Sequence, residues 1–538
     1  MNGIKAVLIK NQSVLVLGFL IVLFTSLGIL SVKQISPTYD EGTHYAYGEQ
    51  LLQGNSTRTG IHGDSNMPFS ALNALPEKLG LYLPEGTVRS FLANFQTARS
   101  MTLLFSVMVA FLVFHWSRSL YGTIPAFASL LLYIFDPNII AHSQLVTTDI
   151  YTAGTTALVF FCLWKFAHKR TFINGLVFSV ALGLSQLAKY TAIVLIPLSL
   201  FSLFLYDLPS LLESFRDQGK FKAFGLRYTG YVAFATIILA IIINMGFIFN
   251  RTFTDFGKYK FRSDWFQNLK TYHPVLNAVP VPLPYPYLDG LDWMRHTQTS
   301  GGNSGNIYLL GKLNKQGFPG YYFVAYFLKV PIATQIIILA AFIVYLTNVK
   351  RRNNFLRDEV FLFPAIIFYT IYFNFFFNVQ IGIRYCLIFF PLLYVFAGSL
   401  FKEWAQFQRV QKISGFVLLA YLVISVLSYF PYYLTYFNEV VWNRIQAYKY
   451  LADSNLDWGQ SGGQLTQYLE KHPNAIFEPQ TIQSGLLVVR INYLVGVTDD
   501  PDKFAWLRNN FEPVGSIANS ILIFQVSPGE LDKLDLTR

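Results

Sequence analysis

The chain has 538 residues, of which 53% are hydrophobic and only 13% are charged. A soluble domain carries about 25% charged residues, so this composition excludes an ordinary soluble protein and predicts a polytopic membrane protein. The net charge of +11 does not indicate nucleic-acid binding, because the basic residues form short clusters beside apolar runs, as membrane topology arranges them. Both cysteines, Cys162 and Cys386, lie inside apolar spans, so we expect neither a disulfide framework nor a cysteine-based metal site.

The first apolar stretch, residues 14–32, is almost uncharged and has the length of about 20 residues that a membrane-crossing helix needs. Directly after it, Asp40 and Glu41 place two adjacent carboxylates at the membrane surface. One interpretation is structural, because acids often cap a helix or stabilise its first turn. The other is functional, and it is favoured because later parts of the chain bring more charged residues to the same side of the membrane.

The distribution of Lys and Arg predicts a cytoplasmic N-terminus and about eleven spans, which places the C-terminus outside. Two large external loops are expected, at 33–98 and 250–319, and residues 66–76 in the first suggest a helix lying in the interface. The expected spans are 14–32, 99–120, 124–135, 150–166, two within 174–206, 228–249, 321–346, 360–377, 385–400 and 413–430.

The character of the chain changes at residue 431, where charges become frequent. Residues 486–489 and 521–524 read as strands, and 464–470 as a helix. We therefore expect a transmembrane module over 1–430, followed by a small extracytoplasmic α/β domain over 431–538.

The chain contains no P-loop, no Gly-x-Gly-x-x-Gly turn, no nucleophile elbow and no His-Glu-x-x-His helix. Instead, acids, a base and cations gather on the external side. Acids beside cations at an apolar boundary suit a substrate with an anionic leaving group and a nucleophile that must lose a proton. The members of this group are Asp40, Glu41, Asp136, His142, Asp149, Lys189, Arg295, Lys312, Lys329 and Arg384.

Several members have a structural alternative of equal or greater weight. Asp136 precedes a proline and suits a turn, while Asp149 opens a helix whose dipole it would stabilise. A single histidine such as His142 is more often structural, and the loop residues Arg295 and Lys312 are more often solvated. The remaining cations, Lys189 and Arg384, are flanked by apolar sequence at an external boundary, where a charge typically marks a substrate or ion pathway.

Five motifs occur in the order that is typical of one enzyme superfamily. They are Asp-Glu-Gly-Thr-His-Tyr from Asp40, Phe-Asp-Pro-Asn from Phe135 together with Thr-Thr-Asp ending at Asp149, Leu-Ala-Lys-Tyr around Lys189, Gly-Ile-Arg-Tyr around Arg384, and Asp-Ser-Asn-Leu-Asp-Trp-Gly-Gln from Asp453. In this set the chain resembles the membrane glycosyltransferases of the protein O-mannosyltransferase superfamily. The resemblance implies a polyprenyl-phosphate-linked sugar donor, sugar transfer on the non-cytoplasmic face, and a bacterial inner membrane.

The resemblance also implies residue roles. Asp40 maps to the catalytic base with Glu41 beside it, Asp149 would assist or bind the acceptor, and Lys189 and Arg384 would bind the donor phosphate. A divalent metal held by these acids is left open, and the acceptor is a protein, lipid or glycan that the sequence does not name. Further candidates for substrate contact are Asp136, Asn138, His142, Arg295 and Lys329.

Two other functions compete with a glycosyltransferase. A transporter or flippase for a lipid-linked sugar would usually show paired halves with broken helices at the midplane, which this chain does not display. A structural assembly protein would not explain why two cations, Lys189 and Arg384, stand in apolar sequence at an external membrane boundary.

Overall fold

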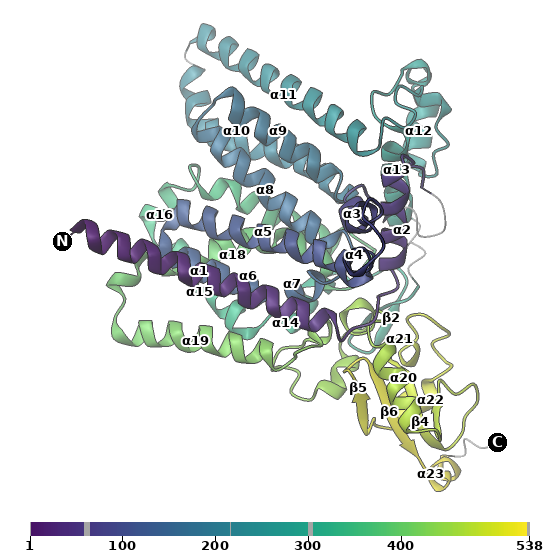
Figure 1. The fold of residues 1–538 in the computed structure, drawn as a ribbon. Helices are drawn as coiled ribbons and strands as arrows, with labels where there is room; N and C mark the ends of the chain where they lie inside the picture. Colours follow the sequence, from purple (N-terminus) through teal and green to yellow (C-terminus); the bar gives the residue numbers. More distant parts are fainter. Residues whose placement is uncertain (1, 59–64, 216, 300–304, 535–538) are drawn as a thin grey trace.

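The computed structural model describes residues 2–58, 65–215, 217–299 and 305–534. Its main body is a bundle of long helices, and a small sheet follows at the C-terminal end of the chain (Figure 1). Many of the long helices are apolar on faces that other parts of the protein do not cover; Phe19, Ile237 and Phe416 are examples. Exposed apolar helix faces of this length are expected where lipid, not water, is the solvent.

Within the described residues, seven helical segments are long and apolar enough to cross a membrane, which identifies an integral membrane protein. They are Gln12–Val32 of α1 (Asn2–Val32), α5 (Phe95–Tyr121), α8 (Asp149–His168), η2 (Tyr190–Val194) with α10 (Leu195–Ser214), α11 (Gln218–Gly246), η6 (Ile383–Phe389) with α18 (Phe390–Gly398) and η7 (Ser399–Gln406), and α19 (Arg409–Leu427).

Four further apolar segments account for the other predicted crossings. α14 (Tyr321–Lys329) and α15 (Ile332–Thr347) meet at a bend of 114° and raise the count to eight if they form one span. The shorter helices are α6 (Thr123–Ile134), α9 (Phe172–Gln186) and α17 (Phe363–Phe375), the last preceded by η5 (Glu359–Phe361). Every predicted crossing falls on a helix, but these three are shorter than the length that spans a bilayer, so the number eleven stays a prediction.

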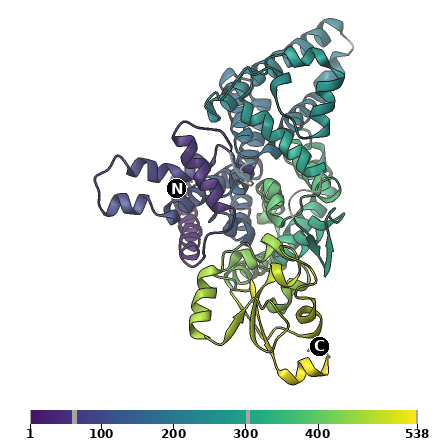
Figure 2. The ribbon, with the colours of Figure 1, turned by 90° about the vertical axis from the view of Figure 1, so that its right-hand side faces the viewer.

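Short elements cover one end of the bundle, at the right of Figure 1, where α1 also ends. Figure 2 looks onto this end and shows N-terminal, middle and C-terminal parts of the chain arranged around it. The expected helix at 66–76 is present as α3, shifted a few residues later. The elements are α2 (Glu41–Leu52), α3 (Ser70–Gly80), α4 (Thr87–Leu92), α7 (Pro137–His142), η3 (Phe256–Lys258), α12 (Asp264–Tyr272), η4 (Pro274–Ala278), α13 (Tyr285–Thr299), β1 (Ile307–Leu309) and β2 (Lys312–Asn314).

The C-terminal region contains a four-stranded sheet in the order β3-β4-β6-β5. The two predicted strands are its centre: β4 and β6 pair antiparallel, with Val488 opposite Ile523. Successive side chains of a strand point to opposite faces, so Leu487 and Phe524 pack into the main core and Val488 and Ile521 into a smaller cluster on the other face. The predicted helix is present as α20. The elements are β3 (Ala475–Phe477), β4 (Gly485–Arg490), β5 (Gly515–Ile517), β6 (Ile521–Val526), α20 (Gly462–Lys471), α21 (Ile491–Leu494), α22 (Ala505–Asn510) and α23 (Pro528–Lys533).

The remaining described elements are short. They are α16 (Val349–Asn353), η8 (Tyr433–Thr435), η9 (Arg444–Lys449) and η10 (Asp453–Asn455). η8 and η10 belong to the segment between α19 and the sheet, which packs against α7 of the bundle.

Candidate active site

Two ion pairs form the centre of the candidate site, and they join four separate parts of the chain. Arg384 Nη1, from η6, lies 3.1 Å from Asp40 Oδ2 at the start of α2. Lys189 Nζ, just before η2, lies 2.7 Å from Asp149 Oδ1, the first residue of α8. Arg384, Lys189 and Asp149 line one narrow pocket, so the two pairs are neighbours. The structure therefore brings together four of the residues that the sequence singled out.

Asp40 is the acid of this cluster that solvent reaches. Its side chain is 40% exposed, whereas that of Asp149 is 3% exposed. Asp40 stands at the N-cap position of α2, yet its carboxylate caps no backbone N–H and turns to Arg384 instead. The helix-cap alternative for Asp40 is therefore wrong.

The surroundings of Asp40 hold it in the ionised form. Burial by itself raises the pKa of the carboxyl, but the Arg384 guanidinium and then His44 outweigh burial and bring the pKa below its ordinary value. His44 is fully buried, which lowers the pKa of its imidazole, and no described residue forms a hydrogen bond with its Nδ1. At neutral pH, Asp40 is thus a carboxylate with a free lone pair, as a proton acceptor must be.

Glu41 does not share this site, although the sequence placed it beside Asp40 as a catalytic candidate. Its carboxylate is completely buried and forms an ion pair of 2.6 Å with Arg99 of α5. It also accepts hydrogen bonds from the backbone N–H groups of Thr38 and Val146. Adjacent residues at a helix start point in directions about 100° apart, so one acid faces the pocket and the other the core. Glu41 therefore fastens α2 to α5.

The two cations of the site lie on aromatic rings. Lys189 Nζ is 4.3 Å from the centre of the Tyr385 ring, and the Arg384 guanidinium is 4.2 Å from that of Trp458. Arg384 Nε is buried and has no hydrogen-bond partner among the described residues. The guanidinium thus keeps a donor free beside its pair with Asp40, which suits recognition of a second anionic group.

His142 approaches the site from α7. Its Nδ1 lies 3.8 Å from Asp149 Oδ2, beyond hydrogen-bond distance, and forms no hydrogen bond within the described part of the chain. Burial lowers the pKa of the imidazole to about 4, so His142 is neutral at pH 7. It belongs to the wall of the site.

Three other predicted substrate-contact residues have structural roles. Asp136 caps α7 and accepts a hydrogen bond from the Tyr394 hydroxyl at 2.6 Å, so the turn alternative was nearer the truth. Asn138 Nδ2 donates to the backbone carbonyl of Lys329, and Lys329 Nζ donates to those of Leu434 and Asn455. These buried groups tie α7 and α14 to the segment after α19.

The two loop cations lie apart from the cluster. Arg295 is an exposed residue of α13, and in the described part of the chain no hydrogen bond or ion pair joins its guanidinium to the four site residues. Lys312 is exposed on β2. Solvation, the alternative that the sequence left open, accounts for both.

The acids do not converge as a metal site would require. Among the described residues, no group of three or more His, Cys, Asp and Glu side chains is placed to hold a metal ion. Glu41 is directed away from Asp40 and its oxygens are already occupied, so the acid trio suggested by the sequence is not assembled.

Sequence reasoning missed Trp458 as a site residue and Arg99 as a buried partner. Trp458 lies in the Asp453–Gln460 motif, but the motif does not reveal which side chain meets Arg384. Arg99 did give a signal, because a lone arginine at the start of an apolar span requires a partner. The partner, Glu41, could not be identified without the fold.

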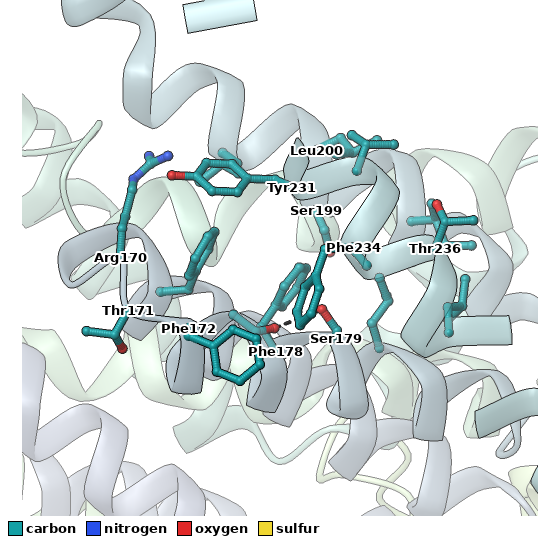
Figure 3. Close-up of a pocket in the computed structure, with 18 residues that line it drawn as sticks. Arg170, Thr171, Phe172, Phe178, Ser179, Ser199, Leu200, Tyr231, Phe234 and Thr236 are labelled. Atoms are coloured by element: carbon teal, nitrogen blue, oxygen red, sulfur yellow. Dashed lines mark hydrogen bonds between the residues drawn. The ribbon is translucent and has the colours of Figure 1, made fainter. Parts of the chain in front are cut away.

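Two apolar cavities lie within the bundle. One, of about 530 Å³, runs between α10 and α17 and is lined by Phe201, Ile367, Tyr372 and other apolar or aromatic side chains. The other, of about 220 Å³, lies among α8–α11 with Arg170 at its edge (Figure 3). Arg170 follows the end of α8 opposite to Asp149, and a helix of this length is about 30 Å long, so this second cavity is remote from the ion pairs.

The candidate site of this helical membrane protein thus combines a solvent-accessible carboxylate, Asp40, with two cations that lie on aromatic rings. Residues 79–243 match the model of the dolichyl-phosphate-mannose-protein mannosyltransferase family. This match confirms the resemblance to the protein O-mannosyltransferase superfamily that the motifs indicate.

Solved structures show more distant similarity. ArnT from Cupriavidus metallidurans bound to undecaprenyl phosphate is 10% identical, with a TM-score of 0.46 over 95% of this chain and 98% of that one. The archaeal oligosaccharyltransferase AglB from Archaeoglobus fulgidus, in complex with an inhibitory peptide and a dolichol-phosphate, is 11% identical, with a TM-score of 0.41 over 77% of this chain and 55% of that one. Comparison with curated proteins gives no match.

Proposed function

We propose that the protein is a membrane glycosyltransferase that moves a sugar from a polyprenyl-phosphate donor to an acceptor hydroxyl on the non-cytoplasmic face. The observation that carries the proposal is the cluster of Asp40, Arg384, Lys189 and Asp149, which pairs an accessible carboxylate with two cations. The family match over residues 79–243 supports the same class of reaction.

In the proposed reaction the acceptor oxygen forms a bond to the anomeric carbon of the sugar while the bond from that carbon to the phosphate oxygen breaks. The proton of the acceptor hydroxyl passes to Asp40, and polyprenyl phosphate leaves with the bonding electron pair. Arg384 and Lys189 stabilise the negative charge that develops on the phosphate. In this proposal the acceptor attacks the face of the anomeric carbon opposite to the phosphate, so the anomeric configuration inverts.

The apolar cavity between α10 and α17 suits the lipid part of such a donor. α17 contributes Tyr372 to this cavity and its neighbour Phe373 to the pocket of Lys189 and Arg384. A polyprenyl chain in the cavity would thus place its phosphate close to the two cations. Exposure of the cavity along the bundle agrees with a substrate that enters from the lipid phase.

The test is a transfer assay on the purified full chain with a panel of polyprenyl-phosphate sugars, which follows the release of polyprenyl phosphate and the mass of the acceptor. Release that depends on an acceptor is the expected result. If instead vesicles containing the protein move a labelled lipid-linked sugar across the bilayer without cleaving it, the protein is a transporter or flippase and the proposal is wrong.

The cations provide the first prediction. Arg384→Ala and Lys189→Ala should each raise the KM for the donor about 10- to 100-fold, because a hydrogen bond to a charged group contributes about 1.5–3 kcal/mol. Arg384→Lys should recover only part of the loss, since lysine cannot make the paired contacts of a guanidinium.

The matched control for these variants is Arg295→Ala, which removes an exposed arginine of α13. Its donor KM should equal that of the wild type. A normal donor KM in both Arg384→Ala and Lys189→Ala would contradict the assignment of the phosphate site.

A second prediction concerns pH. Because Arg384 lowers the pKa of Asp40, Arg384→Ala should raise that pKa, and more of the base is then protonated at any given acidic pH. The acidic limb of the kcat/KM profile should therefore move to higher pH. Lys189→Ala is the control: Lys189 pairs with Asp149, not with Asp40, so the limb should stay in place. A limb that moves equally in both variants would show that it reports another group.

A further inference from the structure

The segment Asp453–Gln460, between α19 and the sheet, touches both of the loops that carry the proposed catalytic pair. One of these loops precedes α2 and ends at Asp40. The other leads into η6, where Arg384 is the second residue. Asp40 and Arg384 are far apart in the chain, so their separation depends on contacts with other parts of the protein. The segment Asp453–Gln460 provides such contacts to both.

On the Asp40 side the contacts are made by backbone. The N–H of Tyr39 donates to the Trp458 carbonyl at 3.1 Å, and the N–H of Ser36 donates to that of Gln460 at 2.8 Å. The N–H of Gly463 donates to Ser36 Oγ at 2.8 Å. Since Asp40 follows Tyr39 directly, its position is set from the C-terminal segment.

On the Arg384 side the contacts come from side chains. Asn455 Oδ1 accepts the N–H of Ile383, the residue before Arg384, at 3.0 Å, and Ser454 Oγ donates to the carbonyl of Ile381. The Trp458 ring lies 4.2 Å from the guanidinium. The backbone that precedes Arg384 is thus held by hydrogen bonds, and its guanidinium is held by the Trp458 ring.

The segment is itself anchored. Asn455 is completely buried; its Nδ2 donates to the Tyr321 hydroxyl at 2.9 Å, and its carbonyl accepts from Lys329 Nζ at 2.6 Å. From the other side, Asn492 of α21 accepts the N–H of Asp453 and donates to the Asp457 carbonyl. Because the segment is fixed from both sides, the C-terminal region helps to determine where Asp40 and Arg384 lie.

We propose that Asn455 and Trp458 are positioning residues, which hold the Arg384 guanidinium against Asp40 and the donor phosphate. This inference rests on the proposed glycosyltransferase function. It assigns to the C-terminal region a part in forming the active site, because Trp458 supplies an aromatic face to the phosphate-binding arginine and the backbone of the same residue fixes the loop of Asp40.

The test is a double-mutant cycle between Trp458 and Arg384 in the full-length protein. Trp458→Leu should raise the donor KM about tenfold, the size expected for a desolvated cation–π contact, whereas Trp458→Phe, which keeps an aromatic face, should lose less. In the Arg384→Ala background the effect of Trp458→Leu should almost vanish, because Trp458 acts through Arg384. The acidic limb of kcat/KM should shift to higher pH in Trp458→Leu, as it does in Arg384→Ala.

Two controls match these variants. Trp442→Leu removes a tryptophan that is 89% exposed, and Asn510→Ala removes an asparagine whose side chain donates within its own helix, to the Trp506 carbonyl. Neither should change the donor KM or the pH profile. If Trp458→Leu does not fold, Trp458→Phe and Asn455→Asp enter the same cycle, and each should be non-additive with Arg384→Ala.

Additive losses, with an unmoved acidic limb, would overturn the positioning role and leave Trp458 and Asn455 as residues of the folded core. This outcome is distinct from failure of the proposed function. In that case the wild type itself would release no polyprenyl phosphate in an acceptor-dependent reaction, whatever the Trp458 variants do.

Discussion

Replacing Asp40 with Asn is expected to lower kcat for sugar transfer by about 10²–10⁴-fold while the protein stays folded. Asparagine keeps the shape of the side chain and removes the lone pair that takes the proton of the acceptor hydroxyl. Asp40 is partly open to solvent and caps no helix, so the substitution disturbs little packing. The measurement is acceptor-dependent release of polyprenyl phosphate under saturating donor.

The same variant should bind donor as well as the wild type or more tightly. In the free protein Arg384 is paired with Asp40, and a neutral amide competes less strongly than a carboxylate for the guanidinium. Donor affinity thus separates Asp40→Asn, which loses turnover, from Arg384→Ala, which loses affinity. The control is Asp255→Asn, which breaks only a surface pair with Lys258 and should leave both constants unchanged. Near-normal turnover by folded Asp40→Asn would remove the proposed base.

The pairing of Asp40 with Arg384 also suggests an order of events. While the guanidinium lies on Asp40, the carboxylate is a weak base, because its pKa is held down. A donor phosphate that draws Arg384 toward itself would release Asp40 and raise its basicity. The base would then reach full strength only when a donor is bound, which disfavours futile activation of an acceptor.

Hydropathy and charge were sufficient to predict the helical bundle, because helical segments that face lipid are apolar and leave a local signal in the sequence. The strands at 486–489 and 521–524 were found for a similar reason, as both are compact apolar runs that pair in the sheet. Lys189 and Arg384 could be singled out as charges flanked by apolar sequence.

The pairing of these charges could not be predicted, because it depends on contacts between distant parts of the chain. Nothing in the sequence indicates that Lys189 pairs with Asp149 or that the Trp458 ring lies on Arg384. The sequence also does not show that Lys329 donates to backbone carbonyls. The neighbours Asp40 and Glu41 show the limit most clearly. The resemblance favours Asp40 as the base, but the sequence does not show that Glu41 is buried, which follows from its ion pair with Arg99.

Glu41 gives the last prediction, because the structure places this acid in a buried ion pair and not in the candidate site. The variant Glu41→Gln should lower the free energy of unfolding by about 3–5 kcal/mol, the cost of leaving a buried charge without its partner. Glu41 Oε1 accepts from Arg99 Nε and the Val146 N–H, and Oε2 accepts from Arg99 Nη2 and the Thr38 N–H. A glutamine amide group would therefore face N–H donors in either orientation.

Thermal unfolding in detergent and the yield of folded protein measure this effect. Glu49→Gln, on the same helix, is the matched control and should unfold near the wild-type temperature, because no ion pair of Glu49 is found among the described residues. The double variant Glu41→Leu with Arg99→Met should be more stable than Glu41→Gln, because it removes both charges together and fills a similar volume. If Glu41→Gln unfolds like the wild type but is inactive, Glu41 takes part in the reaction directly, and its buried pair with Arg99 is not what the α2–α5 contact depends on.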